Sequence, residues 1–219
     1  MATRLYIGDS SKTPAIVKVE EVPKTKFGVN VDTWIGEVDE NGVLKKTTWT
    51  GTLNFAGVKK IGPNSLFYTF YGCTGITSVN LSSLQSVGNT SLNNTFNDCT
   101  GITSVDLSSL TTVDSYGLFY TFYGCTGITS VNLSSLQSIG QYSMQNTFYG
   151  CRELTTISFP SLTDVQTDSF GSSTSNSAFR NCSALTEIHF RADMQATIEA
   201  LTGYADKFGA TNATIYFDL

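Results

Sequence analysis

A repeat of 26 residues constrains the fold of this 219-residue chain more than any other feature of its sequence. Three nearly identical copies begin at Cys73, Cys99 and Cys125, and each opens with the letters CTGITSV. Less regular copies extend the pattern backward to Thr52 and forward past Cys182. A unit this short cannot bury its apolar residues alone, so the repeat predicts coils stacked into a solenoid with one continuous core.

Each copy contains an apolar-x-apolar triplet, which we interpret as a short β-strand, or rung. Alternate side chains of a strand point to opposite faces, so the first and third residues are expected in the core and the middle one outside. Stacking aligns the rungs as a parallel sheet with strands about 4.8 Å apart. The sheet is expected to contain about seven rungs, which begin at Leu53, Val79, Val105, Val131, Ile157, Ile188 and Ile215.

The side opposite to the sheet is predicted from a second pattern. Leu92, Phe96 and Cys99 have the i, i+4, i+7 spacing of a short helix with one buried face, and the same spacing recurs in neighbouring copies. Between rung and helix, Leu84 and Val87 return the chain. We therefore predict an α/β repeat solenoid: a right-handed coil with a parallel sheet on one face and short helices or turns on the other.

The two ends of the chain depart from the repeat. Near the N-terminus, Asn41-Gly42 lies between apolar runs and predicts a hairpin. Near the C-terminus, a helix around Ile198 that Asp193 caps is expected to precede the last rung. The insertion GSSTSNS is predicted to be an exposed loop. We divide the chain into a small β-rich N-terminal cap or attachment segment (1–46), the solenoid (47–190) and a C-terminal cap of a helix and a last rung (191–219).

Charge and hydropathy exclude several classes of function. Residues 61–151 contain no Lys or Arg and the formal net charge is -5, so we expect no binding to nucleic acid or to anionic membranes. No apolar run approaches the length of about 18 residues that membrane insertion needs. The start, MATRLYIGDS, lacks the apolar region of a secretory signal. The protein is expected in a virion or in the cytoplasm as encoded, or at the cell surface if another route exports it.

The sequence offers little catalytic chemistry. All five cysteines occupy one repeat position, three residues after a Phe, which favours core packing over disulfides or a zinc site. His189 is the single histidine, and an ion pair or plain exposure explains it better than catalysis. The acidic residues of the regular copies lie at different repeat phases and form no glycosidase-like pair. We expect no catalytic residue, no metal site and no cofactor.

The middle positions of the rungs form the first candidate binding surface. In solenoids, such a column is a usual place for a ligand; alternatively, it is a solvated sheet whose Asn ladder stabilises the stack. We call these residues the polar rung column: Asn54, Asn80, Asp106, Asn132, Ser158 and His189.

The opposite side carries the second candidate surface, which amphipathicity does not explain. Its aromatic residues point away from the predicted buried face, and the coil between them has Asn93, Asn94 and Asn97 at the same positions. Two interpretations stay open: sideways packing between coils, or an exposed patch for a partner chain or for sugar rings. We call these residues the aromatic set: Phe67, Tyr68, Tyr71, Phe119, Tyr120, Tyr123 and Tyr149.

The repeat, L/I-T-S-V/I-x-L/F-x-S-L-x-x-V/I-G followed by F-x-x-C, resembles the BspA-like leucine-rich repeat family over residues 52–190. ISFPSLTDV, residues 157–165, is most similar to the I-x-I-P-x-x-V core of that family, whereas other copies have Ser in place of Pro. The resemblance implies a bacterial surface or secreted recognition protein that binds host proteins, cells or glycans without catalysis. The stretches LYIGDSSKTPAIVKVE and KFGVNVDTWIGEVDENGVL resemble the starts of tail-associated or other virion proteins from phages of gut bacteria.

These features lead to two hypotheses of function. The first is a non-enzymatic recognition or adhesion protein that binds a protein or glycan on a cell surface, with the N-terminal segment attaching it to a larger assembly such as a phage tail. The second is a structural spacer of a virion or surface, whose aromatic residues mediate homo-oligomer formation without a specific ligand.

Overall fold

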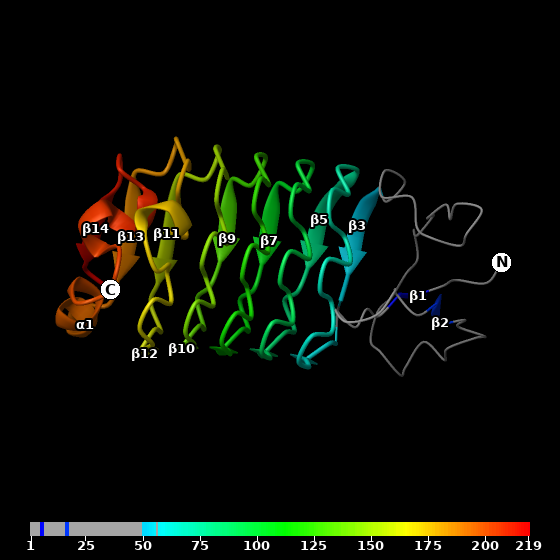
Figure 1. Ribbon diagram of the computed structural model, residues 1–219, viewed down its shortest axis with the longest axis horizontal. Helices are drawn as coiled ribbons and strands as arrows, with labels where there is room; N and C mark the ends of the chain where they lie inside the picture. Colours follow the sequence, from blue (N-terminus) through cyan, green and yellow to red (C-terminus); the bar gives the residue numbers. More distant parts are fainter. Residues whose placement is uncertain (1–4, 7–15, 18–49, 56) are drawn as a thin grey trace.

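The computed structural model describes residues 5–6, 16–17, 50–55 and 57–219, and it shows a solenoid whose coils stack in one row (Figure 1). Most inward positions of the rungs are buried, as Val79 and Leu81 illustrate, and the others are partly buried. The predicted fold class, an α/β repeat solenoid with parallel strands, is confirmed. The rung strands are β3 (Gly51–Asn54), β5 (Ile76–Asn80), β7 (Ser104–Asp106), β9 (Ser130–Asn132), β11 (Thr156–Phe159), β13 (Glu187–Phe190) and β14 (Thr214–Phe217).

The rung strands pair in parallel with a register that follows the repeat. Val79 lies opposite Val105, which lies opposite Val131. The hydrogen-bonded order is β3-β5-β7-β9 in one sheet and β11-β13-β14 in a second, and β9 contacts β11 where the two sheets meet. Each buried side chain therefore stacks on its equivalent in the next coil, which makes the core continuous along the molecule.

A further parallel sheet forms where the sequence predicted only a return of the chain. Its strands have two residues each and pair in the order β12-β10-β8-β6-β4. The second residue of the middle strands is buried, as Val87 and Val113 show. These strands are β4 (Lys60–Ile61), β6 (Ser86–Val87), β8 (Thr112–Val113), β10 (Ser138–Ile139) and β12 (Asp164–Val165).

Of the short helices or turns predicted for the third side of the coils, the structure shows consecutive turns, so the helical interpretation of Leu92, Phe96 and Cys99 is wrong. We call this side the turn face: residues 63–72, 89–98, 115–124 and 141–150. Within a coil, the Thr95 amide donates to the Leu92 carbonyl at 3.0 Å. Between coils, the Phe96 amide donates to the Thr121 carbonyl at 3.0 Å. Along the turn face, the amides of successive residues thus alternate between partners in their own coil and partners in the next.

Coil spacing explains why helices are absent from the turn face. An α-helix is about 10 Å wide, whereas strands that pair in a sheet are about 4.8 Å apart, so helices could stack in register with the rungs only if the row of coils curved strongly. A backbone that bonds between coils satisfies its polar groups at the shorter spacing. The i, i+4, i+7 pattern nevertheless identified the buried residues, because Leu92, Phe96 and Cys99 are fully buried.

A ladder of phenylalanine rings runs through the core beneath the turn face. Successive rings are nearly parallel, with interplanar angles of 4° to 8°. Threonines beside the ladder bond from coil to coil, as the buried Thr121 hydroxyl does when it donates to the Leu92 carbonyl at 2.8 Å. The ladder is formed by Phe70, Phe96, Phe122, Phe148 and Phe179.

At the N-terminal end, β1 (Leu5–Tyr6) pairs with β2 (Ile16–Val17) in antiparallel fashion. The hairpin predicted at residues 41–42 lies outside the described residues. In the predicted inserted loop, residues 171–177, a short 3₁₀-helix forms, η2 (Thr174–Asn176).

At the C-terminal end, η3 (Ala192–Met194), α1 (Gln195–Glu199) and η4 (Tyr204–Gly209) precede β14. The predicted Asp193 cap is wrong: Asp193 lies within η3, where its carboxylate pairs with the Arg191 guanidinium. Among the described residues, no helix has the length and hydropathy needed to cross a membrane.

Candidate functional site

The cysteines form one buried row of thiols, as their shared repeat position predicted. Each thiol from Cys99 onward lies against the preceding coil, and the Cys125 Sγ donates to the Phe96 carbonyl at 3.0 Å. Burial raises the pKa of the Cys99 and Cys182 thiols to about 12. The structural prediction for these residues is confirmed, and it gains a sulfur hydrogen bond that the sequence did not indicate.

The polar rung column contributes to the turns that end the rungs. The Asp106 Oδ1 accepts a hydrogen bond from the Ser108 amide at 2.9 Å, and the Asn132 Oδ1 accepts from the Ser134 amide at 3.1 Å. Asn80 makes the same bond to the residue two positions on, and Asn54 lies opposite Asn80 in the register. Asx turns of this kind are a structural reason for Asn or Asp at the end of a strand.

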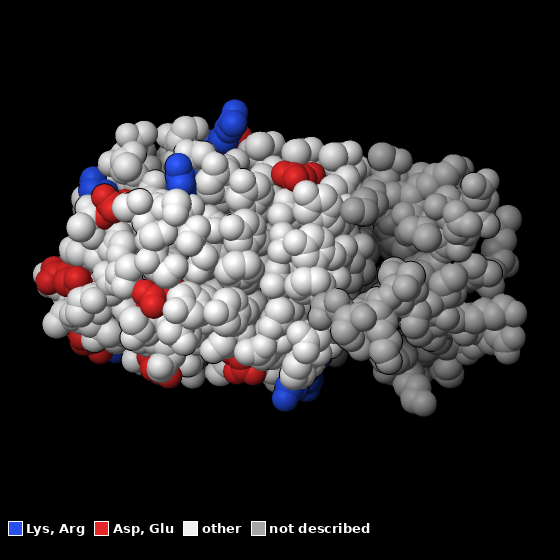
Figure 2. All heavy atoms as spheres, viewed as in Figure 1, with Lys and Arg blue, Asp and Glu red and all other residues white. Residues whose placement is uncertain are grey.

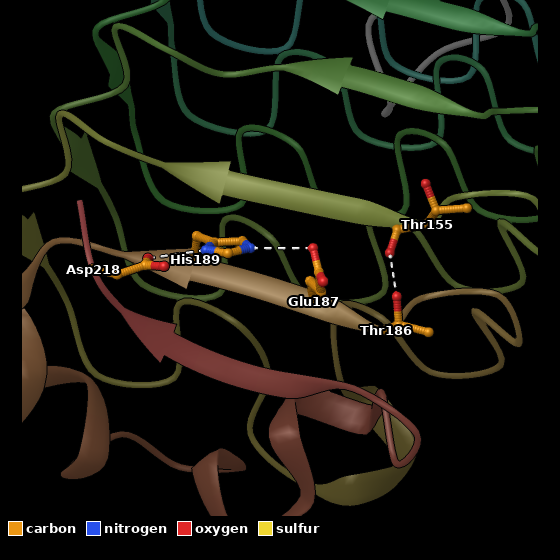
Figure 3. Close-up of polar contacts among 5 residues, drawn as sticks. All are labelled: Thr155, Thr186, Glu187, His189 and Asp218. Atoms are coloured by element: carbon orange, nitrogen blue, oxygen red, sulfur yellow. Dashed lines mark hydrogen bonds and ion pairs between the residues drawn. The ribbon is translucent and has the colours of Figure 1, made fainter.

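At the C-terminal end of the polar rung column, His189 contacts charged side chains instead of forming an Asx turn (Figure 3). The His189 Nδ1 lies 2.9 Å from the Asp218 Oδ1, and its Nε2 lies 3.5 Å from the Glu187 Oε2. The imidazole also stacks on Tyr216, with ring centroids 4.8 Å apart. Burial lowers the pKa of His189, but the hydrogen bonds and charges of Asp218 and Glu187 outweigh burial and raise it above 6.5. Ser158 lies opposite His189 in β11.

The aromatic set gathers on the turn face as two clusters. In the first cluster, Tyr68 packs edge-on against Phe67 and stacks on Tyr71, with centroids 4.6 and 5.6 Å apart. The Tyr71 hydroxyl donates to the Asp98 carboxylate in the next coil at 3.4 Å.

The second cluster lies two coils further along the turn face. Tyr120 packs against Phe119 and stacks on Tyr123, with centroids 4.6 and 5.3 Å apart. Tyr123 in turn stacks on Tyr149 of the next coil at 4.3 Å. The Tyr149 hydroxyl accepts a hydrogen bond from the Asn181 amide group at 2.7 Å.

Sequence reasoning missed two further tyrosines of this surface. Tyr116 and Tyr142 pack on each other with centroids 5.1 Å apart, and Tyr116 also contacts Phe119 at 5.5 Å. Both lie at one repeat position, which Asn64 and Thr90 occupy in earlier coils. Comparison of that position between coils is the signal that would have found them.

Buried amides lie between the two aromatic clusters. Asn93, Asn94 and Asn97 bond to one another in a chain, and they belong to the coil that lies between those of Tyr68 and Tyr120. The residues that the structure describes offer no hydrogen-bond partner to the Asn97 Oδ1 or to either amide atom of Asn146, which lies one coil beyond Tyr120. Buried polar atoms usually have partners, so these amides retain capacity for a bound water molecule.

The backbone under the aromatic residues is in the left-handed region. Tyr68, Tyr116, Tyr120 and Tyr142 have φ of 54° to 57°. Asn tolerates this region, and Asn94 holds it at the position equivalent to Tyr68, whereas other non-glycine side chains are strained there by about 1 kcal/mol or more. The backbone therefore does not explain these tyrosines. Sideways packing explains them in part, yet Tyr68 keeps 46% and Tyr116 38% of its surface exposed.

The repeat matches the model of a known protein family. A family model described as "BspA type Leucine rich repeat region" matches in 6 copies, over residues 52–176 and 148–201. No curated protein matched the chain. The resemblance of the N-terminal segment to virion proteins gained no support from either comparison.

Proposed function

This chain belongs to the BspA-type leucine-rich repeat family, and on that premise we propose that it is a non-enzymatic recognition protein that binds a protein or glycan on a cell surface. The binding surface in this proposal is the turn face. It comprises the aromatic set together with Tyr116 and Tyr142, and we call it the aromatic surface.

One observation supports the turn face over the sheet as the binding surface: exposed tyrosines lie on a left-handed backbone that disfavours them. A residue kept in a strained conformation is a reason to seek a function for its side chain. The outward Asn and Asp residues of the sheet already have a structural task in the Asx turns of Asp106 and Asn132. Asn94 occupies the left-handed position equivalent to Tyr68 in its own coil, so the backbone does not require a tyrosine there.

The chemistry of the aromatic surface suits sugar rings and protein side chains. Aromatic faces offer large apolar contact area at low entropic cost, and tyrosine hydroxyls add hydrogen bonds. The unpartnered atoms of Asn97 and Asn146 lie in the same region of the turn face. Charged side chains are few over the middle coils in the view of Figure 2, so long-range attraction of a charged partner contributes little.

The proposal is tested with substitutions taken from the protein's own repeats. Tyr68→Asn and Tyr120→Asn introduce the residue of Asn94, and Tyr116→Asn and Tyr142→Asn introduce the residue of Asn64. We expect the quadruple variant to fold and to lose binding to cells or to a glycan array. A matched control, Asp106→Asn with Asn132→Asp, alters the sheet face while retaining acceptors for the Asx turns. Loss of binding in the control and not in the quadruple variant would place the site on the sheet.

The structural spacer is the second candidate function, because hydrogen bonds on all three sides of the coils favour a rigid rod. In this case the aromatic surface would pair with a second copy of the chain. Analytical ultracentrifugation of the wild type and the quadruple variant distinguishes the two functions. Self-association that the substitutions abolish, without any binding to cells or glycans, supports the spacer.

The proposed setting at a surface has two versions, a bacterial surface and a phage virion. The virion version rests on the N-terminal resemblance alone. Tail or capsid genes beside the coding gene are the observation expected for a virion component, and a secretion locus is the observation expected for a bacterial surface protein.

A further inference from the structure

A polar pocket of about 410 Å³ lies at the C-terminal end of the solenoid, away from the polar rung column. Three segments that are distant in sequence form it: the inserted loop, the turn before β13, and the segment that leads from η4 to β14. Its volume is in the range of pockets that hold small ligands. Its lining includes Thr174, Arg180, Asn181, Asp206, Thr211 and Asn212.

Arg180 is the cation of this lining, and its guanidinium is uncommitted. Within the described part of the chain, no hydrogen bond or ion pair engages its side chain, although the residue is half-buried. Neighbouring cations are occupied: Arg191 pairs with Asp193, and the Lys207 Nζ donates to the Thr211 carbonyl at 3.3 Å. A guanidinium presents five donors in a fork that matches a carboxylate.

The backbone holds Arg180 in place at the pocket. The Gly150 amide donates to the Arg180 carbonyl at 2.9 Å, which ties this residue to the preceding coil. On the other side, Gly209 approaches so closely that a Cβ there would lie 2.9 Å from the Arg180 Cα. The backbone of Arg180 is therefore fixed at the pocket, and only the rotamer freedom of its side chain is lost when a ligand binds.

The remaining lining decides between classes of anion. Among the described residues, the pocket has no aliphatic or aromatic side chain, so a hydrophobic acid gains little there. Hydroxyl and amide groups, as in Thr211 and Asn212, suit a ligand rich in hydroxyls. Asp206 accepts hydrogen bonds from such hydroxyls and opposes a phosphate, which carries more negative charge than a carboxylate.

We propose that this pocket binds a carboxylated sugar, a uronic or sialic acid residue, with its carboxylate on Arg180 and its hydroxyls on the amide, hydroxyl and carboxylate groups of the lining. Asn181 connects the pocket to the aromatic surface through its hydrogen bond to the Tyr149 hydroxyl. A longer acidic glycan can therefore extend from the pocket towards Tyr149 and Tyr123. The pocket site does not depend on binding at the tyrosines.

The test is isothermal titration calorimetry of the full chain with sodium glucuronate and with N-acetylneuraminate. We expect one of the two to bind, and Arg180→Gln to weaken that binding by at least about tenfold. Arg152→Gln removes an exposed arginine outside the pocket and is expected to leave binding unchanged. Arg180→Lys keeps the positive charge but loses the forked donors of the guanidinium, so it is also expected to weaken binding. This variant replaces Arg180→Gln in the test if the Gln variant does not fold.

Neutral glucose, glutamate and inorganic phosphate are the comparison ligands. Binding of glucose as tight as that of glucuronate would overturn the role of the carboxylate. Binding of phosphate or glutamate as tight as that of both acidic sugars would overturn the ligand class. Absence of binding by both acidic sugars, or equal affinity in Arg180→Gln and the wild type, would overturn the site itself. None of these results depends on the tyrosine variants that test the proposed function.

Discussion

Single side chains in this solenoid act mainly between coils. The Thr121 hydroxyl and the Cys125 thiol both donate to backbone carbonyls of the preceding coil, and Phe122 stacks on Phe96. Repeat position therefore predicts the role of a residue better than its chemistry does. Cysteine shows this most clearly, because five reactive-looking thiols are parts of the core.

Thiol reactivity tests this account of the cysteines. Burial holds their pKa values high, at about 12 for Cys99 and Cys182, so the reactive thiolate is scarce at neutral pH. We expect no thiol to react with Ellman's reagent in the folded protein and five to react after denaturation. A fast-reacting thiol in the native state would show that the row is accessible.

The protonation of His189 is expected to stabilise the fold. Its pKa is raised above 6.5 by Asp218 and Glu187, so the folded state binds a proton more tightly than the unfolded state does. The stabilisation is fully present below pH 6.5 and is lost as pH rises through the raised pKa. Because the chain has one histidine, NMR titration of its ring protons measures this directly. A value at or below 6.5, or no change in Asp218→Asn, would contradict the contacts in Figure 3.

At the scale of elements, the periodic pattern of the sequence predicted the rung strands and the buried positions. It did not predict the two-residue strands or the turns, which leave no pattern of their own. The rungs were predictable because alternation defines a strand and the triplets recur in register. The two-residue strands such as Ser86–Val87 are too short to show alternation. The turn face was taken for helices because turns that place Leu92, Phe96 and Cys99 inside reproduce helical spacing.

For the candidate surfaces, the sequence predicted which residues belong to them but not the conformations of those residues. Comparison of the coils identified the aromatic set, because its positions vary between aromatic and polar residues while the buried Phe position beside them does not vary. The left-handed backbone of Tyr68 and the Asx bond of Asp106 are conformations, which no repeat pattern reports. The pocket was beyond prediction, because Arg180 and Asp206 meet only through the packing of the C-terminal cap.

Close contact between coils requires a glycine at position 101. A Cβ at Gly101 would lie 2.4 Å from the Thr74 carbonyl oxygen and 2.7 Å from that of Ile76. Gly101→Ala must therefore separate two hydrogen-bonded coils, and we expect a loss of more than about 2 kcal/mol in the free energy of unfolding. At Gly62, a Cβ would meet only the Ser65 Oγ at 3.5 Å. Urea denaturation that gave equal losses for Gly101→Ala and Gly62→Ala would contradict the close packing.

At the scale of the whole molecule, stability comes from contacts between neighbouring coils. Phe122 is fully buried and stacks on Phe96 and Phe148, with centroids 5.6 and 5.8 Å apart. Phe122→Ala should cost about 3 to 5 kcal/mol, because it removes a ring from the middle of the ladder. Asn132→Ala, on the sheet surface, should cost far less. Similar losses in thermal melts of the two variants would show that inward and outward positions were assigned wrongly.

The central claim for the whole molecule is that its turn face is a recognition surface built on a stable scaffold. The most direct measurement is binding to a glycan array by the wild type and by the variant with Tyr68→Asn, Tyr116→Asn, Tyr120→Asn and Tyr142→Asn. Relief of backbone strain offsets lost ring contacts, so we expect the variant's stability to change by less than about 1 kcal/mol. The account predicts that a signal seen for the wild type on glycans without a carboxylate, which the Arg180 pocket is not expected to bind, disappears in this folded variant. A signal on such neutral glycans that survives all four substitutions would contradict it.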